Sequence, residues 1–127
     1  MTRGRPGAKN DNPHVEQKNY THVRLLLGWQ RIEKPELIKE INQMYEAANL
    51  LTNFFCANRH LVHKERRGSR YYKRYDEPQT PADRLLQSDC LNEAQKIHLT
   101  ELRSNLDPYK LRKIIDTKQR SIFSKLR

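Results

Sequence analysis

Apolar residues recur at helical spacing in two long stretches of the N-terminal half, and helix signals bound both. The first stretch begins after Asn12, a good N-cap, with Pro13 at the first helical position, and it ends at Gly28. The second opens at Pro35 and runs to about residue 52. The pattern therefore predicts two consecutive helices. The inner stripe expected for the first helix comprises Val15, Asn19, Val23, Leu26 and Leu27.

The helical period disappears beyond these stretches, where two polar arms flank Arg67 and Gly68. The second arm is rich in tyrosine, which is enriched in strands. We therefore predict a β-hairpin over roughly residues 61–75, with Phe54 and Phe55 anchoring the joint before it. A proline-rich loop, residues 76–81, should close it.

Three further helices are predicted in the C-terminal part. Thr80, Pro81 and Asp83 have the spacing of a capping box, so a short helix should begin there. Another helix should start near Asn92 and the last one at Pro108. The apolar face expected for the last helix comprises Leu111, Ile114, Ile115, Ile122 and Leu126. The fold class predicted from all these elements is mainly α with one β-hairpin.

Composition makes the expected core thin. The chain has 127 residues, of which 35% are hydrophobic, and its mean hydropathy is −1.02. This length fits one domain, and so polar a chain favours an extended helical assembly or a piece that packs on something larger. The two cysteines are too few for a disulfide framework, which favours a reducing, cytoplasmic setting.

The net charge of +10 implies an anionic partner, most often nucleic acid. Residues 59–74 and 110–127 each carry seven Lys or Arg against one acid. A membrane surface is the other anionic possibility. However, no apolar run approaches the roughly 20 residues that span a bilayer, and no signal-peptide pattern occurs. We therefore expect no membrane partner.

The predicted hairpin supplies the candidate DNA-binding residues. Its cations can neutralise phosphates, and its tyrosines can stack on exposed bases. The candidates are Lys64, Arg66, Arg67, Arg70, Lys73, Arg74, Tyr71 and Tyr72. The alternative is a solvated charged hairpin whose tyrosines form a core on one face. The basic side of the last helix has two equally good interpretations. It contacts a duplex backbone, or it is a charged surface that only aids solubility.

Glu16 is the candidate catalytic and metal-binding residue. Helical spacing places it close to Val23 and Leu27, at the margin of the expected buried face. An acid in the first turn can complement the helix dipole, whereas an inward acid can instead bind a cation. One acid cannot hold a pair of Mg²⁺ ions, and Asp11 lies before the cap, so it is a poor second ligand.

Cys56, His60 and His63, with the more distant Cys90, have the residue types of a zinc site. Their spacing lacks a Cys-x2-Cys knuckle, so we expect free buried cysteine and surface histidines instead.

Three strings together resemble the C-terminal part of DDE (Asp-Asp-Glu) transposases with an integrase core. They are "KNDNPHVEQKNYTHVRLLLGWQR", "GSRYYKRYDEPQTPADRLLQS" and "LDPYKLRKII", which follow one another along the chain in the family's order. In that family two Asp and one Glu bind two divalent metals on a ribonuclease H-like fold. The resemblance identifies Glu16 as the final Glu.

The resemblance implies a fragment of a ribonuclease H-like core, its sheet absent, plus the region that follows it. Residues 1–11 would be an irregular basic lead-in and 12–55 the last helices of the integrase-like core. Residues 56–81 would form the basic hairpin with its loop, and 82–127 the C-terminal helices. The lysines found four and seven residues after the Glu in retroviral integrases are replaced here by Tyr20 and Val23. DNA-end contacts of those relatives therefore do not transfer.

The resemblance also implies Mg²⁺ or Mn²⁺, which we do not expect this fragment to bind alone because both catalytic Asp residues are missing. Its partners would be transposon ends and target DNA, and a full-length transposase or a second copy of the chain. The expected function is DNA transposition in a prokaryotic cytoplasm, at the nucleoid, by a truncated transposase that is inactive alone. The alternative is a stand-alone basic nucleic-acid-binding or regulatory protein in which Glu16 only caps a helix.

Overall fold

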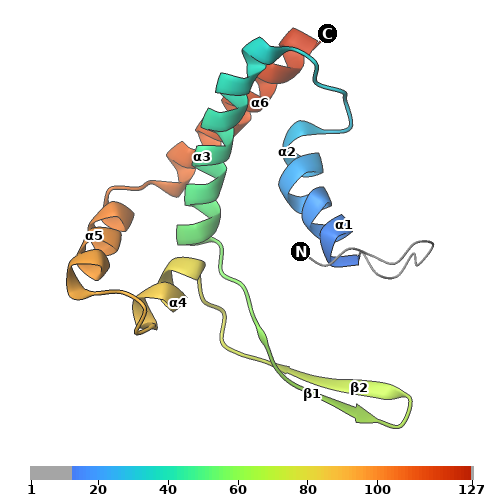
Figure 1. Ribbon diagram of the computed structural model, residues 1–127, viewed down its shortest axis with the longest axis vertical. Helices are drawn as coiled ribbons and strands as arrows, with labels where there is room; N and C mark the ends of the chain where they lie inside the picture. The colour runs from blue at the N-terminus through green and yellow to red at the C-terminus, as the bar shows by residue number, and fades with distance from the viewer. Residues whose placement is uncertain (1–12, 127) are drawn as a thin grey trace.

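Helices dominate the computed structural model, which describes residues 13–126 apart from the side chain of His14 (Figure 1). Within this part a single two-stranded antiparallel hairpin interrupts the helices. The prediction of a mainly helical fold with one hairpin is confirmed. Among the described residues, no helix is both long and apolar enough to span a bilayer.

The centre of the molecule is an antiparallel pair formed by α3 (Ile38–Phe55) and α6 (Pro108–Leu126) (Figure 1). A 3-10 turn, η3 (Pro35–Leu37), leads into α3, as the proline at position 35 predicts. Polar contacts set the register of the pair, since Lys118 Nζ donates to Gln43 Oε1 at 2.7 Å and Lys125 pairs with Glu40. The buried core residues on these elements are Leu37, Met44, Ala47, Leu111, Ile115 and Ile122.

The first predicted helix forms as three consecutive segments, α1 (Pro13–Asn19), the π-helical η2 (Tyr20–Arg24) and α2 (Leu25–Leu27). Gly28 ends it with a φ of 68°, as predicted. The sequence did not indicate the π-helical turn. In the structure the Tyr45 hydroxyl of α3 donates to the carbonyl oxygen of His22 in this turn, at 2.8 Å.

The inner stripe predicted for this helix is only partly correct. Leu26 and Leu27 pack against the core, and Gln119 Nε2 of α6 donates to the Leu26 carbonyl at 2.9 Å. Val15 is 69% exposed and Val23 is exposed too, because the helix diverges from α3 towards its N-terminus (Figure 1). Periodicity identified an apolar face here, but in the described residues nothing covers its first half.

Two shorter helices, α4 (Pro81–Gln87) and α5 (Glu93–Ser104), connect the hairpin to α6. Both begin with a capping box, formed by Thr80 with Asp83 and by Asn92 with Gln95. The predicted starting points of α4, α5 and α6 are therefore confirmed. Ile114, predicted on the apolar face of α6, is exposed, whereas its neighbour Ile115 is buried.

Candidate nucleic-acid interface

The hairpin consists of β1 (Leu61–Arg67) and β2 (Arg70–Tyr75), and it projects from the helices (Figure 1). Arg67 lies opposite Arg70, so Gly68 and Ser69 form the two-residue turn. Gly68 has a φ of 63°, the positive value that tight hairpin turns require. The predicted hairpin and its limits are confirmed, with the turn one residue later than the pattern indicated.

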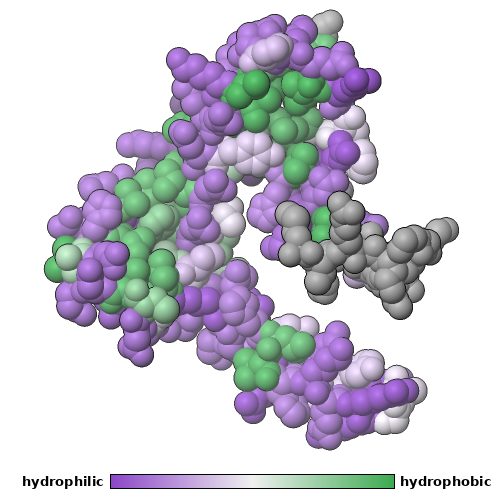
Figure 2. Space-filling view, in the orientation of Figure 1, coloured by the Kyte–Doolittle hydropathy of each residue, from purple (hydrophilic) through white to green (hydrophobic). Residues whose placement is uncertain are grey.

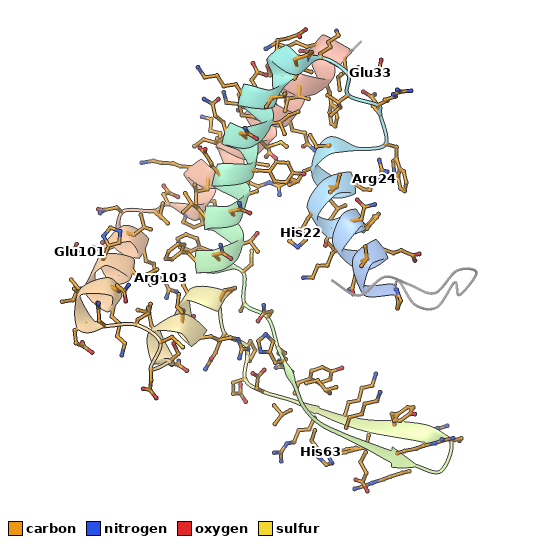
Figure 3. All side chains as sticks on the ribbon, in the orientation of Figure 1. His22, Arg24, Glu33, His63, Glu101 and Arg103 are labelled. Atoms are coloured by element: carbon orange, nitrogen blue, oxygen red, sulfur yellow. The ribbon has the colours of Figure 1, made fainter. Side chains whose placement is uncertain are left out.

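Every residue of both strands is exposed to solvent. Tyr71 is 54% and Tyr72 50% exposed, and Tyr75 is exposed as well. The alternative in which the tyrosines form a core on one face is therefore wrong. The reason is that no helix of the described chain covers either face of the ribbon. In Figure 2 the end of the hairpin carries mainly hydrophilic residues, and in Figure 3 its side chains project from both sides.

The pairing register sorts the hairpin side chains onto two faces, because directly opposite residues of an antiparallel pair share a face. We call one the Lys64 face and the other the Glu65 face. The Lys64 face carries Lys64, Arg66, Tyr71 and Lys73. The Glu65 face carries His63, Glu65, Arg67, Arg70, Tyr72 and Arg74. An irregularity between Leu61 and His63 shifts the register at the base, where Leu61 pairs with Tyr75.

Each face holds one cation against one tyrosine ring. The Lys64 ammonium lies 4.4 Å from the centroid of the Tyr71 ring, and the Arg67 guanidinium lies 4.8 Å from that of Tyr72. Both distances are within the range of cation–π attraction. Each tyrosine ring therefore positions one cation on its face of the ribbon.

The two faces differ in how their cations are neutralised. On the Glu65 face, Arg67 Nη2 lies 3.0 Å and His63 Nε2 lies 3.8 Å from Glu65 Oε2. The Lys64 face has three cations and no acid. Arg66 Nε donates to the Gly68 carbonyl at 3.1 Å, which keeps its side chain near the turn without neutralising it. Uncompensated positive charge is therefore present on both faces and is greater on the Lys64 face.

The base of the hairpin is fixed to α4 by Arg84. Arg84 Nη1 lies 2.6 Å from Asp76 Oδ2, and Arg84 Nη2 donates to the Asn58 carbonyl at 2.9 Å. The other carboxylate oxygen of Asp76 accepts the His60 N–H at 2.6 Å. The Arg84 hydrogen bond and the His60 N–H lower the pKa of Asp76, because both favour the ionised carboxylate.

A second ion pair extends this support to α5. Asp83, in the capping box of α4, accepts hydrogen bonds from the Thr80 hydroxyl at 2.7 Å and from Arg103 Nη1 at 2.6 Å. The Thr80 and Arg103 side chains lower the pKa of Asp83. Sequence reasoning found the capping box but neither ion pair, since a cap is local and the arginine partners lie 8 and 20 residues away.

Glu16 is exposed on α1, so its expected position at the margin of a buried face is wrong. Asp11, considered as a second ligand, lies outside the described residues. Among residues 13–126, no three His, Cys, Asp or Glu side chains lie close enough to hold a metal ion together. A single exposed carboxylate does not fit a two-metal centre, which requires several oxygen donors.

Cys56 and Cys90 are free and exposed, which corrects the expectation of a buried cysteine. His60 and His63 lie at the base of the exposed hairpin, as expected for surface histidines. The backbone of His60 takes part in the contact with Asp76.

Part of the basic charge of α6 holds the helix pair together. Lys118 and Lys125 contact α3, and Arg112 Nε lies 3.1 Å from Asp116 on the same helix. Lys110 and Lys113 are exposed near the start of α6. Arg120 is exposed as well, so α6 carries a second basic surface beside that of the hairpin.

The uncharacterized protein y4rM of Sinorhizobium fredii is similar to this chain, with 38% identity over 84 residues. The matched segment is 66% of this chain and 24% of y4rM. The chain thus spans about a quarter of the length of that curated relative. No family model matches the chain, and no solved structure matches it.

Proposed function

We propose that this chain binds DNA through its hairpin, as the C-terminal part of a DDE transposase-like protein. The observation that carries the proposal is a projecting ribbon, exposed on both faces, with six Lys or Arg side chains and a single acid in its strands. Such a surface has little use in packing the chain's own core. It suits the phosphate backbone, where neutralising charge releases counterions and provides affinity without reading sequence.

The relation to transposases rests on the three strings quoted above. The resemblance assigns one catalytic acid, Glu16, to this chain. The chain would therefore contribute DNA contacts and one metal ligand to an assembly whose two Asp residues lie elsewhere. Transposon ends and target DNA are its partners, which places it at the nucleoid of a prokaryotic cell.

A salt titration of DNA binding tests the DNA-binding part. A variant with all six hairpin cations changed to Gln (Lys64, Arg66, Arg67, Arg70, Lys73 and Arg74) should lose most of the dependence of log K on log salt. The expected loss is roughly 0.9 per phosphate contact removed. A variant with Lys18, Arg31 and Lys39 changed to Gln removes exposed charge elsewhere and should keep most of the slope. An unchanged slope in the hairpin variant would exclude the hairpin from the interface.

The second candidate is a stand-alone protein that binds DNA or a full-length transposase and regulates it. The exposed apolar residues Val15 and Leu25 on the N-terminal helix, with Trp29 just after it, favour a protein partner for this segment. Complementation separates the two candidates. A fragment that supplies a ribonuclease H-like sheet and two Asp residues should regain strand transfer with this chain under the first candidate. Under the second candidate, the chain should restore nothing and should inhibit an intact transposase.

A further inference from the structure

Each face of the hairpin contains a pair of like charges directly across the two strands. Lys64 lies opposite Lys73 on the Lys64 face, and Arg67 lies opposite Arg70 on the Glu65 face. Like charges in this position destabilise a strand pair. Glu65 offsets part of the repulsion on its own face, since it contacts Arg67, but it does not reach the Lys64 face. The free hairpin therefore carries an electrostatic cost on both sides that bound anions would remove.

The absence of a covered face limits how the ribbon can bind. A ribbon that docks flat on a polyanion needs cations on one face only and can pack its other face on its own domain. Here both faces are exposed along their whole length, and an isolated two-stranded hairpin is only marginally stable. A ligand that places anions on both sides of the ribbon accounts for both observations.

Double-stranded DNA provides two such anionic walls across each groove. We infer that the hairpin enters the major groove tip first, with the Lys64 face towards one phosphate backbone and the Glu65 face towards the other. The inference rests on the proposed DNA binding. Stacked sheets pack about 10 Å apart, which is the thickness of one sheet with its share of the interdigitated side chains. The major groove is about 12 Å wide and the minor groove about 6 Å, so the ribbon fits the former.

The attachment of the hairpin is consistent with entry by the tip. The base is held by Arg84, Asp76 and the Asn58–Gln79 bridge, whereas the Gly68–Ser69 turn lies at the free end (Figure 1). A Cβ at Gly68 would have open space around it, so nothing else in the described chain packs against the tip there. Paired, stacked bases leave the tyrosines no ring to stack on, and the tyrosines instead contact cations of their own ribbon.

Two matched triple variants test the two-sided contact. The first changes Lys64, Arg66 and Lys73 to Gln on one face, and the second changes Arg67, Arg70 and Arg74 to Gln on the other. Each removes three cations, so each should lower the salt slope of duplex binding by up to about 2.7, with the two losses adding in the combined variant. A loss confined to one triple would overturn two-sided insertion and leave DNA binding intact. No loss in either would overturn the proposed function as well.

A base modification that fills the major groove tests which groove the hairpin enters. Duplexes whose cytosines carry a bulky glucosyl group on the 5-position fill the major groove and leave the minor groove and the phosphates unchanged. Binding to such a duplex should weaken at least tenfold relative to the unmodified duplex. Equal binding to both would overturn major-groove insertion, as would tighter binding to the corresponding single strand.

The variant Lys73→Glu separates an effect on the stability of the hairpin from an effect on DNA binding. This change places an acid opposite Lys64, so the hairpin itself should become more stable while duplex binding weakens. Amide exchange of the strands reports the first effect and the salt titration the second. Unchanged or tighter DNA binding by Lys73→Glu would contradict the contact on the Lys64 face.

Discussion

Arg84 and Asp76 join the hairpin to the helices, with Arg84 Nη1 2.6 Å from Asp76 Oδ2. The same guanidinium donates to the Asn58 carbonyl, so one side chain of α4 contacts the chain before β1 and after β2. Lysine has a single ammonium and cannot reproduce this fork. We therefore expect Arg84→Lys to release the base of the hairpin. Amide exchange should accelerate at His60, whose N–H donates to the Asp76 carboxylate, and at Asp76, whose N–H donates to the His60 carbonyl.

Arg70→Lys is the matched control for that change, because Arg70 lies at the tip, away from the base. It should leave exchange at His60 and Asp76 unchanged. Equal exchange rates at these two amides in wild type and Arg84→Lys would show that the base of the hairpin stays ordered without the ion pair.

Low pH should weaken the Asp76–Arg84 and Asp83–Arg103 ion pairs that hold the base of the hairpin. The pKa values of Asp76 and Asp83 are lowered from an ordinary value of 3.8, by Arg84 and the His60 N–H and by Thr80 and Arg103 respectively. A carboxyl with a lowered pKa contributes stability that is complete above its unfolded value and is lost as the pH falls through its folded value. The melting temperature should therefore fall as the pH drops below about 5.

The double variant Asp76→Asn/Asp83→Asn should melt lower than wild type at neutral pH and converge with it in acid. Asp89→Asn, at an exposed position between α4 and α5, should follow the wild-type curve. A parallel offset between double variant and wild type at every pH would mean that the ionised form of these carboxyls is not the stabilising one.

The buried face of α6 should dominate the stability of the helix pair. Ile115 is 3% exposed in the core, whereas Ile114, one position earlier, is 44% exposed. Ile115→Ala should cost about 2–5 kcal/mol through lost burial and the cavity that remains. Ile114→Ala removes the same atoms from a half-exposed site and should cost about 1 kcal/mol or less. Urea unfolding of both variants measures the difference, and similar costs would contradict the assignment of the core.

Local signals explain why the sequence predicted the element limits well. Pro35, the Thr80–Asp83 box and Pro108 act within one turn of their own helices, and the structure uses all three. The hairpin was recognisable because the helical period stops where a glycine turn and tyrosines begin. Such features depend on backbone conformation near each residue, which the sequence specifies directly.

Burial was predicted less well, because it depends on contacts between distant segments. The spacing of Val15 and Val23 indicated an apolar face but not what would cover it. The expected position of Glu16 at the margin of a buried face was wrong for the same reason. The hairpin shows the same limit. Its cations were evident from composition, whereas their division between two faces required the strand register. The Asp76–Arg84 and Asp83–Arg103 pairs arise only after α4 and α5 are placed.

Backbone geometry at Gly28 gives a fourth prediction. With φ 68° and ψ −152°, Gly28 occupies a region that is essentially restricted to glycine. A Cβ there would lie 3.6 Å from Phe123, an ordinary contact, so the cost of Gly28→Ala should come from the backbone. We expect a loss of about 1–3 kcal/mol. Phe123→Leu combined with Gly28→Ala should not recover stability, and recovery in urea unfolding would instead indicate steric crowding.

The last prediction concerns Glu16. As an acid that complements the helix dipole it acts within this chain, whereas as a metal ligand it requires two Asp residues from a partner. The side chain is exposed in the first turn of α1, so Glu16→Gln removes a favourable charge at a helix N-terminus and should cost about 1 kcal/mol or less. DNA binding should not weaken, since α1, which carries Glu16, lies apart from the hairpin (Figure 1). We also expect no Mg²⁺- or Mn²⁺-dependent DNA cleavage by the purified chain, because one carboxylate cannot bind a catalytic metal pair. Cleavage that Glu16→Gln abolishes would contradict this prediction and would make the chain a nuclease by itself. With a fragment that supplies two Asp residues, the same substitution should abolish the restored strand transfer if Glu16 is the third acid.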